Sequence, residues 1–120
     1  MTGRVEGRHA LLPVTFRVSG QADLTIEFVV DTGFTDYLTL PPAAIAALGL
    51  PFLHQVAADL ADDSTVQMAV HVATVLWNDA VREVPVLATG RRPLLGTAML
   101  EEQELVAQFR ENGLVTVEDL

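Results

Sequence analysis

The 120-residue sequence contains no cysteine and no lysine. Without cysteine there is no disulfide scaffold, no thiolate zinc site and no cysteine nucleophile. All seven basic residues are arginine, and 16 acidic residues bring the net charge to −9, so a basic surface for nucleic acid or an anionic membrane is excluded. No apolar run reaches the roughly 20 residues that span a bilayer, and we expect a cytoplasmic protein.

The composition indicates one folded domain. Half of the residues are hydrophobic and 19% are charged, a ratio that excludes a disordered chain. A chain of this length buries about two thirds of its unfolded surface and therefore needs no metal or disulfide to form a core. Because no repeat or linker divides the sequence, we expect a single domain over residues 1–120.

Alternation of apolar and polar residues predicts strands along most of the chain. The end of the second strand, residues 28–30, is apolar on both faces, which indicates deep burial. Pro85 would place its own strand at a sheet edge or at a bulge. The predicted strands span residues 12–18, 24–31, 37–40, 52–60, 65–77 and 81–88.

One short helix is predicted over residues 43–48. Pro41 and Pro42 suit the first helical turn, and Gly49 is a natural helix end. A second helix is indicated by the strong helix formers over residues 97–104.

The C-terminal third has two interpretations. In one, the second helix continues to Arg110. In the other, it ends near Glu102, and Asn112-Gly113 lies between two strands at residues 105–109 and 114–117. We favour the hairpin, because Asn-Gly between apolar runs is a strong hairpin signal.

The tripeptide Asp31-Thr32-Gly33 is the strongest candidate for chemistry. It follows the doubly apolar strand end, so a carboxylate there has buried support behind it. The Thr32 hydroxyl can orient a neighbour, and Gly33 lets the backbone turn tightly or approach a substrate. Taken alone, three such residues are more typical of an ordinary turn.

The wider context favours the catalytic interpretation. Some sixty residues after Asp31, Leu94-Leu95-Gly96 follows Arg92-Pro93, and a long hairpin lies between the two stretches. Together they resemble the two signatures of retropepsin-like aspartic proteases, in particular the small single-domain bacterial members. The resemblance implies an all-β, closed barrel-like acid-protease fold with one or two short helices, a flap hairpin and no cofactor or metal.

The resemblance also implies residue roles. The chain has one Asp-Thr-Gly match and thus half a site, so Asp31 would face Asp31 of the partner subunit in a two-fold homodimer. Thr32 would bind the partner's loop, and the terminal strands would interleave between subunits. The remaining roles are the active-site loop (Thr32, Gly33, Phe34, Thr35), its support (Leu94, Leu95, Gly96) and the flap (Ala61, Asp62, Asp63, Ser64, Thr65).

Three positions depart from the family pattern. Phe34 replaces a small residue, and the flap tip has Asp62 and Asp63 in place of glycine. Thr97 occupies the position at which the retroviral enzymes carry an arginine that braces the dimer. The glycine-free tip would be stiffer, and its charges would repel acidic substrates.

We therefore expect an aspartic endopeptidase that binds an extended peptide and has a bell-shaped pH profile below neutrality. A dimeric peptide-binding module on the same fold is the alternative, and a monomer in which Asp31 caps a turn is the third. His9, His54 and His71 are widely spaced and are not expected to bind a metal.

Overall fold

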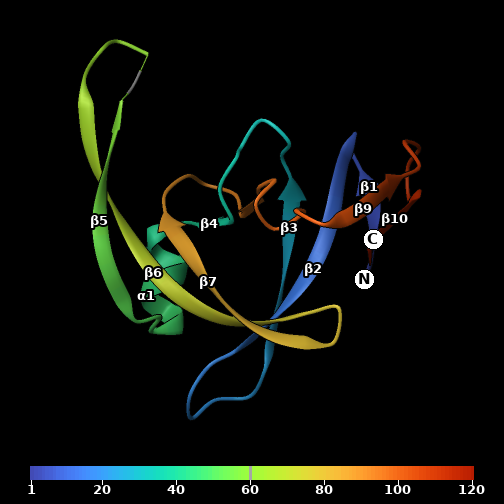
Figure 1. Ribbon diagram of the computed structural model, residues 1–120, viewed down its shortest axis with the longest axis horizontal. Coiled ribbons are helices and arrows are strands. Elements are labelled where there is room, and N and C mark those ends of the chain that lie inside the picture. Colours follow the sequence, from blue (N-terminus) through green and yellow to red (C-terminus); the bar gives the residue numbers. More distant parts are fainter. Residues whose placement is uncertain (60) are drawn as a thin grey trace.

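The computed structural model describes residues 1–59 and 61–120, and within these residues the chain is mostly β, with one short helix (Figure 1). The predicted 52–60 strand is present, although its last residue lies outside the described residues. In chain order the elements are β1 (Thr2–Glu6), β2 (His9–Arg17), β3 (Leu24–Val30), β4 (Leu38–Leu40), α1 (Pro42–Leu48), β5 (Phe52–Asp59), β6 (Thr65–Trp77), β7 (Ala80–Ala88), β8 (Leu94–Leu95), β9 (Gln103–Ala107) and β10 (Leu114–Asp119).

Strand pairing links all of these strands in the order β5-β6-β7-β4-β8-β3-β2-β1-β10-β9. An additional pairing joins β2 to β6, so the pairings run in a ring through β2, β3, β8, β4, β7 and β6. The buried cluster draws on every strand of this ring. At its centre Phe16 and Phe28 stack with their ring centroids 5.9 Å apart, and both side chains are fully buried.

The predicted helix is confirmed as α1. Pro41 precedes it, and Gly49 ends it with a φ of 64°, a left-handed conformation that costs glycine little. Ile45 and Leu48 are buried in the core cluster, so α1 is held by packing. In the described residues no helix is long and apolar enough to cross a membrane.

Pro85 does not lie at a bulge, and its strand is not an edge strand. The β6–β7 register is continuous, with Val72 opposite Pro85. The N–H of Val72 donates to Pro51 O and so points away from β7. The nitrogen of Pro85 therefore faces away from β6, toward the side on which β4 begins to pair only at Val86. A missing N–H costs little at that point.

The two terminal strands pair with each other inside the chain. The pairing of β1 with β10 includes Thr2 opposite Thr116, and β1 also pairs with β2, while β10 also pairs with β9. The expectation that these strands interleave with a partner is therefore corrected, because both edges of each strand are already occupied. The free edge on this side of the sheet belongs to β9.

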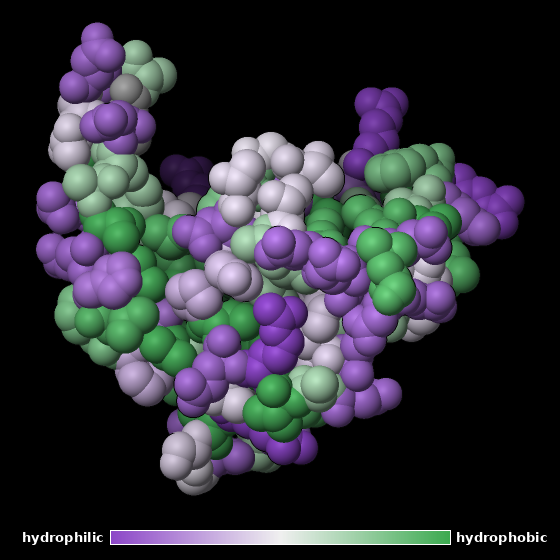
Figure 2. Space-filling view, in the orientation of Figure 1, coloured by the Kyte–Doolittle hydropathy of each residue, from purple (hydrophilic) through white to green (hydrophobic). Residues whose placement is uncertain are grey.

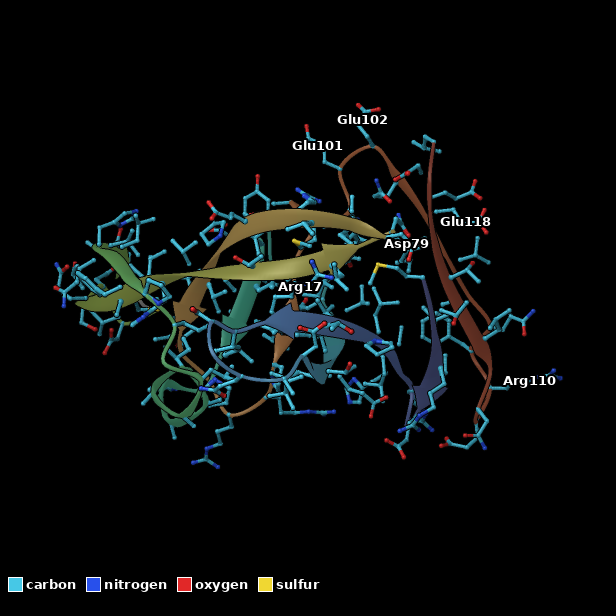
Figure 3. All side chains as sticks on the ribbon, turned by 90° about the horizontal axis from the view of Figure 1, so that it is seen from below. Arg17, Asp79, Glu101, Glu102, Arg110 and Glu118 are labelled. Carbon is cyan, nitrogen blue, oxygen red and sulfur yellow. The ribbon has the colours of Figure 1, made fainter. Side chains whose placement is uncertain are left out.

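The C-terminal hairpin is confirmed, whereas the second helix is wrong. The β9–β10 pair has Leu105 opposite Val117, and residues 97–102 form consecutive turns before it. The N–H of Ala98 donates to Asp36 O, which lies outside any local helical ladder. A helix over residues 97–104 is instead prevented at its C-terminal end, where Glu102 takes a left-handed φ of 60° and Gln103 pairs with Asp119 of β10. The side chains of Glu101, Glu102, Arg110 and Glu118 point outward around this region (Figure 3).

Candidate active site

Asp31 directly follows the last residue of β3. The backbone N–H of Asp31 donates to Leu95 O at 2.9 Å, which continues the parallel β3–β8 pairing of Val29 with Leu94 and Val30 with Leu95. Leu95 is fully buried. The N–H of Leu94 also donates to the buried Thr39 hydroxyl at 3.2 Å, which fixes β8 to β4. Leu94 and Leu95 therefore lie beside the strand that leads into the loop, and their role as its support stays a prediction.

The loop after Asp31 fixes its carboxylate. The N–H of Gly33 donates to Asp31 Oδ1 at 2.9 Å, and the N–H of Phe34 donates to Asp31 O at 3.1 Å. The side chain of Asp31 therefore closes a tight turn with one oxygen, and among the described residues its other oxygen accepts no hydrogen bond. Gly33 does not have a positive φ, so the turn itself does not require glycine there. Its lack of a side chain leaves the approach to Asp31 open.

Gly96 is the point at which the second stretch contacts the first. The N–H of Gly96 donates to Tyr37 O at 2.8 Å, and that of Thr97 donates to Phe34 O at 2.9 Å. A Cβ on Gly96 would lie 2.1 Å from Asp36 O and 2.7 Å from Phe34 O. The two backbone segments are therefore in direct contact. Thr97 stands where the retroviral enzymes carry the arginine that stabilises the dimer, and here its backbone N–H holds the loop of its own chain.

A pocket of about 400 Å³ opens beside Asp31, which we call the Asp31 pocket. Asp31 is the only carboxylate among the described residues that line it. The prediction of deep burial holds for Phe28 and Val29, but Val30 is half-buried because it faces this pocket. The Asp31 pocket is lined by His9, Val29, Val30, Asp31, Thr32, Arg92 and Leu94.

A second pocket of about 400 Å³ continues from the first, and we call it the β9 pocket. It shares His9, Val30 and Thr32 with the Asp31 pocket. Its remaining wall includes Arg8 and the C-terminal hairpin residues Leu105, Ala107 and Phe109. Thr32 thus lines both the Asp31 pocket and the β9 pocket, whose walls include residues of β2, β3, β8 and β9.

Sequence reasoning missed the cations at this site. Arg8 and Arg92 come from two loops far apart in the sequence, and His9, for which only metal binding was considered, lines both pockets. The sequence held no direct signal for Arg92, because in the parallel β3–β8 pair Leu94 lies opposite Val29 and the end of β8 is the part beside Asp31. Arg92 nevertheless lines the Asp31 pocket. In the described residues no group of three His, Cys, Asp or Glu side chains could hold a metal ion.

The predicted flap residues lie at the tip of the β5–β6 hairpin, away from Asp31. Neither pocket includes a flap residue, and the tip stands clear of the end of β3 (Figure 1). Polar side chains gather at the tip, and hydrophobic ones lie lower on the hairpin, where Phe52 is 59% exposed (Figure 2). Of the predicted loop residues, Phe34 is half-buried, while Thr35 is exposed and lines neither pocket.

The flap tip makes its turn without glycine. Asp62 Oδ1 accepts hydrogen bonds from both the hydroxyl and the backbone N–H of Ser64, and Asp63 adopts a φ of 64°. Thr65 adds a hydrogen bond from its hydroxyl to Asp59 Oδ1 at 3.1 Å. Side-chain hydrogen bonds therefore take the place of glycine in this turn, and the stiffness of the tip stays a prediction.

Ser64→Ala should raise the pKa of Asp62. The side-chain and backbone hydrogen bonds from Ser64 hold this pKa below its ordinary value of 3.8, because they favour the ionised carboxylate. They stabilise the turn above that pH, and this stabilisation is lost as the pH falls through the lowered pKa. An NMR titration of the Asp62 carboxyl carbon measures the shift. An Asp62 midpoint in Ser64→Ala equal to that of the wild type would contradict the assignment.

The fold can be compared with known proteins. No model of a known family matches the chain, and a comparison with curated proteins also finds no match. Among solved structures, the crystal structure of a retropepsin-like aspartic protease from Rickettsia conorii matches it with a TM-score of 0.62 and 18% sequence identity. The match covers 100% of this chain and 91% of that one. The chain therefore has the fold of the retropepsin-like aspartic proteases.

Proposed function

We propose that this protein is an aspartic endopeptidase, with Asp31 from each subunit of a homodimer as the catalytic residue. The observation that carries the proposal is the position of Asp31. Its carboxylate follows β3, is oriented by the Gly33 N–H and lines an open pocket, in a chain with the retropepsin-like fold.

The chemistry explains why a second copy is needed. Hydrolysis by carboxylates uses one ionised group to take a proton from water and one protonated group to polarise the scissile carbonyl. Two carboxylates about 3 Å apart divide these roles, because both cannot ionise together; aspartic proteases are the standard case. No described residue of this chain offers a second carboxylate in the Asp31 pocket. The partner subunit's Asp31 would supply it.

The other predicted residues have supporting roles in this proposal. Thr32 is exposed beside Asp31, where its hydroxyl would bind the partner's loop and hold the pair in register. The β5–β6 hairpin would close over an extended peptide and pair with it as a strand does. The ring of strand pairings supports a closed, barrel-like form of one domain over residues 1–120.

One observation favours a second function, a dimeric peptide-binding module. The flap turn is closed by Asp62 and Ser64, so a rigid, acidic tip would have to move toward Asp31 before turnover. The two functions predict different responses to a transition-state analogue.

A statine-type inhibitor separates these functions. A working protease should cleave members of a peptide library between about pH 4 and 7.5, with a bell-shaped profile, and the inhibitor should bind at least about 100-fold more tightly than a substrate peptide. Specific activity should also fall on dilution below the dimer dissociation constant. If a well-folded dimer cleaves no peptide and binds inhibitor and peptide equally weakly, the peptidase proposal is excluded and the peptide-binding module is supported.

A further inference from the structure

The arginines of this acidic protein differ in whether they form ion pairs. Arg4 is bonded to Glu6 and Glu27, each at 3.2 Å, and Arg17 lies 3.7 Å from Asp23. Among the described residues, no such ion pair forms at Arg8 or Arg92, the two arginines that line the pockets beside Asp31. In a chain of net charge −9, these pockets therefore carry arginines that form no ion pair among the described residues, although Asp31 lines the same pocket as Arg92.

Apolar side chains lie beside these arginines, which are themselves exposed. Val29, Val30 and Leu94 line the Asp31 pocket, and an apolar wall lowers the local dielectric and focuses the field of a nearby cation. A guanidinium group presents paired N–H donors that match a carboxylate. An acidic side chain therefore complements the Asp31 pocket better than a neutral one.

We propose that the Asp31 pocket selects peptides with an Asp or Glu side chain next to the scissile bond, and that Arg92 is the residue that recognises it. Arg8 would bind a second acidic side chain in the β9 pocket. The inference rests on the proposed peptidase function and names its substrate class. It limits the expected repulsion by Asp62 and Asp63 to substrate positions beneath the flap tip, because no described flap residue lines either pocket.

The test compares two peptides that differ only in Glu or Gln beside the cleaved bond. At pH 6 the wild type should cleave the Glu peptide with about tenfold higher kcat/KM. The ratio should fall to about two at pH 3.5, since an ordinary Glu has a pKa near 4.3. Asp31 and His9 also line this pocket and carry ionisable side chains, so the ratio is measured in Arg92→Gln at each pH as well.

The variants separate recognition from general charge. Arg92→Gln should bring the ratio to about one at every pH, Arg92→Lys should keep part of it, and Arg92→Glu should favour a Lys peptide. Arg91→Gln is the matched control, because Arg91 is the adjacent arginine but lines neither pocket. It should leave the ratio unchanged. A wild-type ratio near one, or equal losses in Arg91→Gln and Arg92→Gln, overturns the inference.

Binding to Asp31→Asn distinguishes failure of this inference from failure of the peptidase proposal. Fluorescein-labelled apolar octapeptides with one central Glu or Gln are titrated into this variant, with anisotropy as the readout. If binding prefers Glu in a manner that depends on Arg92 but the wild type cleaves nothing, acidic recognition is supported and the peptidase proposal fails. If the wild type cleaves both peptides equally, the peptidase proposal is supported and acidic recognition fails. If Arg92→Gln instead dissociates the dimer at constant selectivity, Arg92 pairs with the other subunit and the inference fails.

Discussion

Asp31→Asn is expected to lower kcat/KM for peptide cleavage by at least about 10³-fold, with little effect on folding. The amide cannot take a proton from water, and in a homodimer the substitution removes both carboxylates at once. Asn keeps an oxygen at Oδ1, so it can still accept the 2.9 Å hydrogen bond from the Gly33 N–H. The measurement is kcat/KM on one cleaved peptide, beside the circular dichroism and sedimentation of both proteins.

Asp36→Asn provides the matched control for this substitution. Asp36 lies in the same loop, is exposed and uses Oδ1 to accept a hydrogen bond from the Tyr37 N–H, but it lines neither pocket. Its activity should stay within about twofold of the wild type, because exposed polar substitutions away from a site have small effects. Residual cleavage by Asp31→Asn at the level of Asp36→Asn would exclude Asp31 as the catalytic residue.

Gly96→Ala should cause the largest loss of stability of any single methyl addition at the site, about 3 kcal/mol or more. The new Cβ would meet Asp36 O at 2.1 Å and the Phe34 ring at 2.6 Å. The first contact is with backbone, so the loop that bears Asp31 would have to move away from β8. Urea denaturation at pH 7 measures the change, which corresponds to a drop in Tm of about 10 °C.

Gly33→Ala separates steric crowding from a general cost of replacing glycine. A Cβ there would meet only Asp31 Oδ1, at 3.2 Å, and the backbone does not need a positive φ. We expect a stability change below about 1 kcal/mol together with a marked loss of activity, because the methyl group narrows the approach to Asp31. If Gly33→Ala and Gly96→Ala lowered the free energy of unfolding equally, close packing beneath the loop would not explain the glycine at position 96.

The strands and the position of Asp31 were predictable from local patterns. The alternation before Asp31 places it at a strand end, and the Asn112-Gly113 turn predicts the C-terminal hairpin. The helix over residues 97–104 failed because Glu102 takes a left-handed φ of 60° and Gln103 already pairs with Asp119 of β10. That pairing depends on the fold and leaves no trace in helix propensity.

Two other features depended on distant pairing. β1 contains a glycine and two charged residues, so its pattern is weak, and it is a strand because β2 and β10 pair with both its edges. The two arginines beside Asp31 are separated by more than eighty positions, and neither flanks the Asp-Thr-Gly motif. A sequence motif identifies the reacting group, whereas the walls around it are assembled by topology.

The pairing of β1 with β10 has a consequence for how the chain folds. One edge of β1 stays unsatisfied until residues near Thr116 have been synthesised, since that edge is completed by β10. During translation, the unpaired edge could recruit strands from other nascent chains. Contacts this far apart in sequence also slow folding, because a long loop must close before they form. The sheet that contains β1 and β10 is therefore completed only after β10 has been synthesised. Substitutions that weaken β10 should lower the yield of folded protein before they lower its activity.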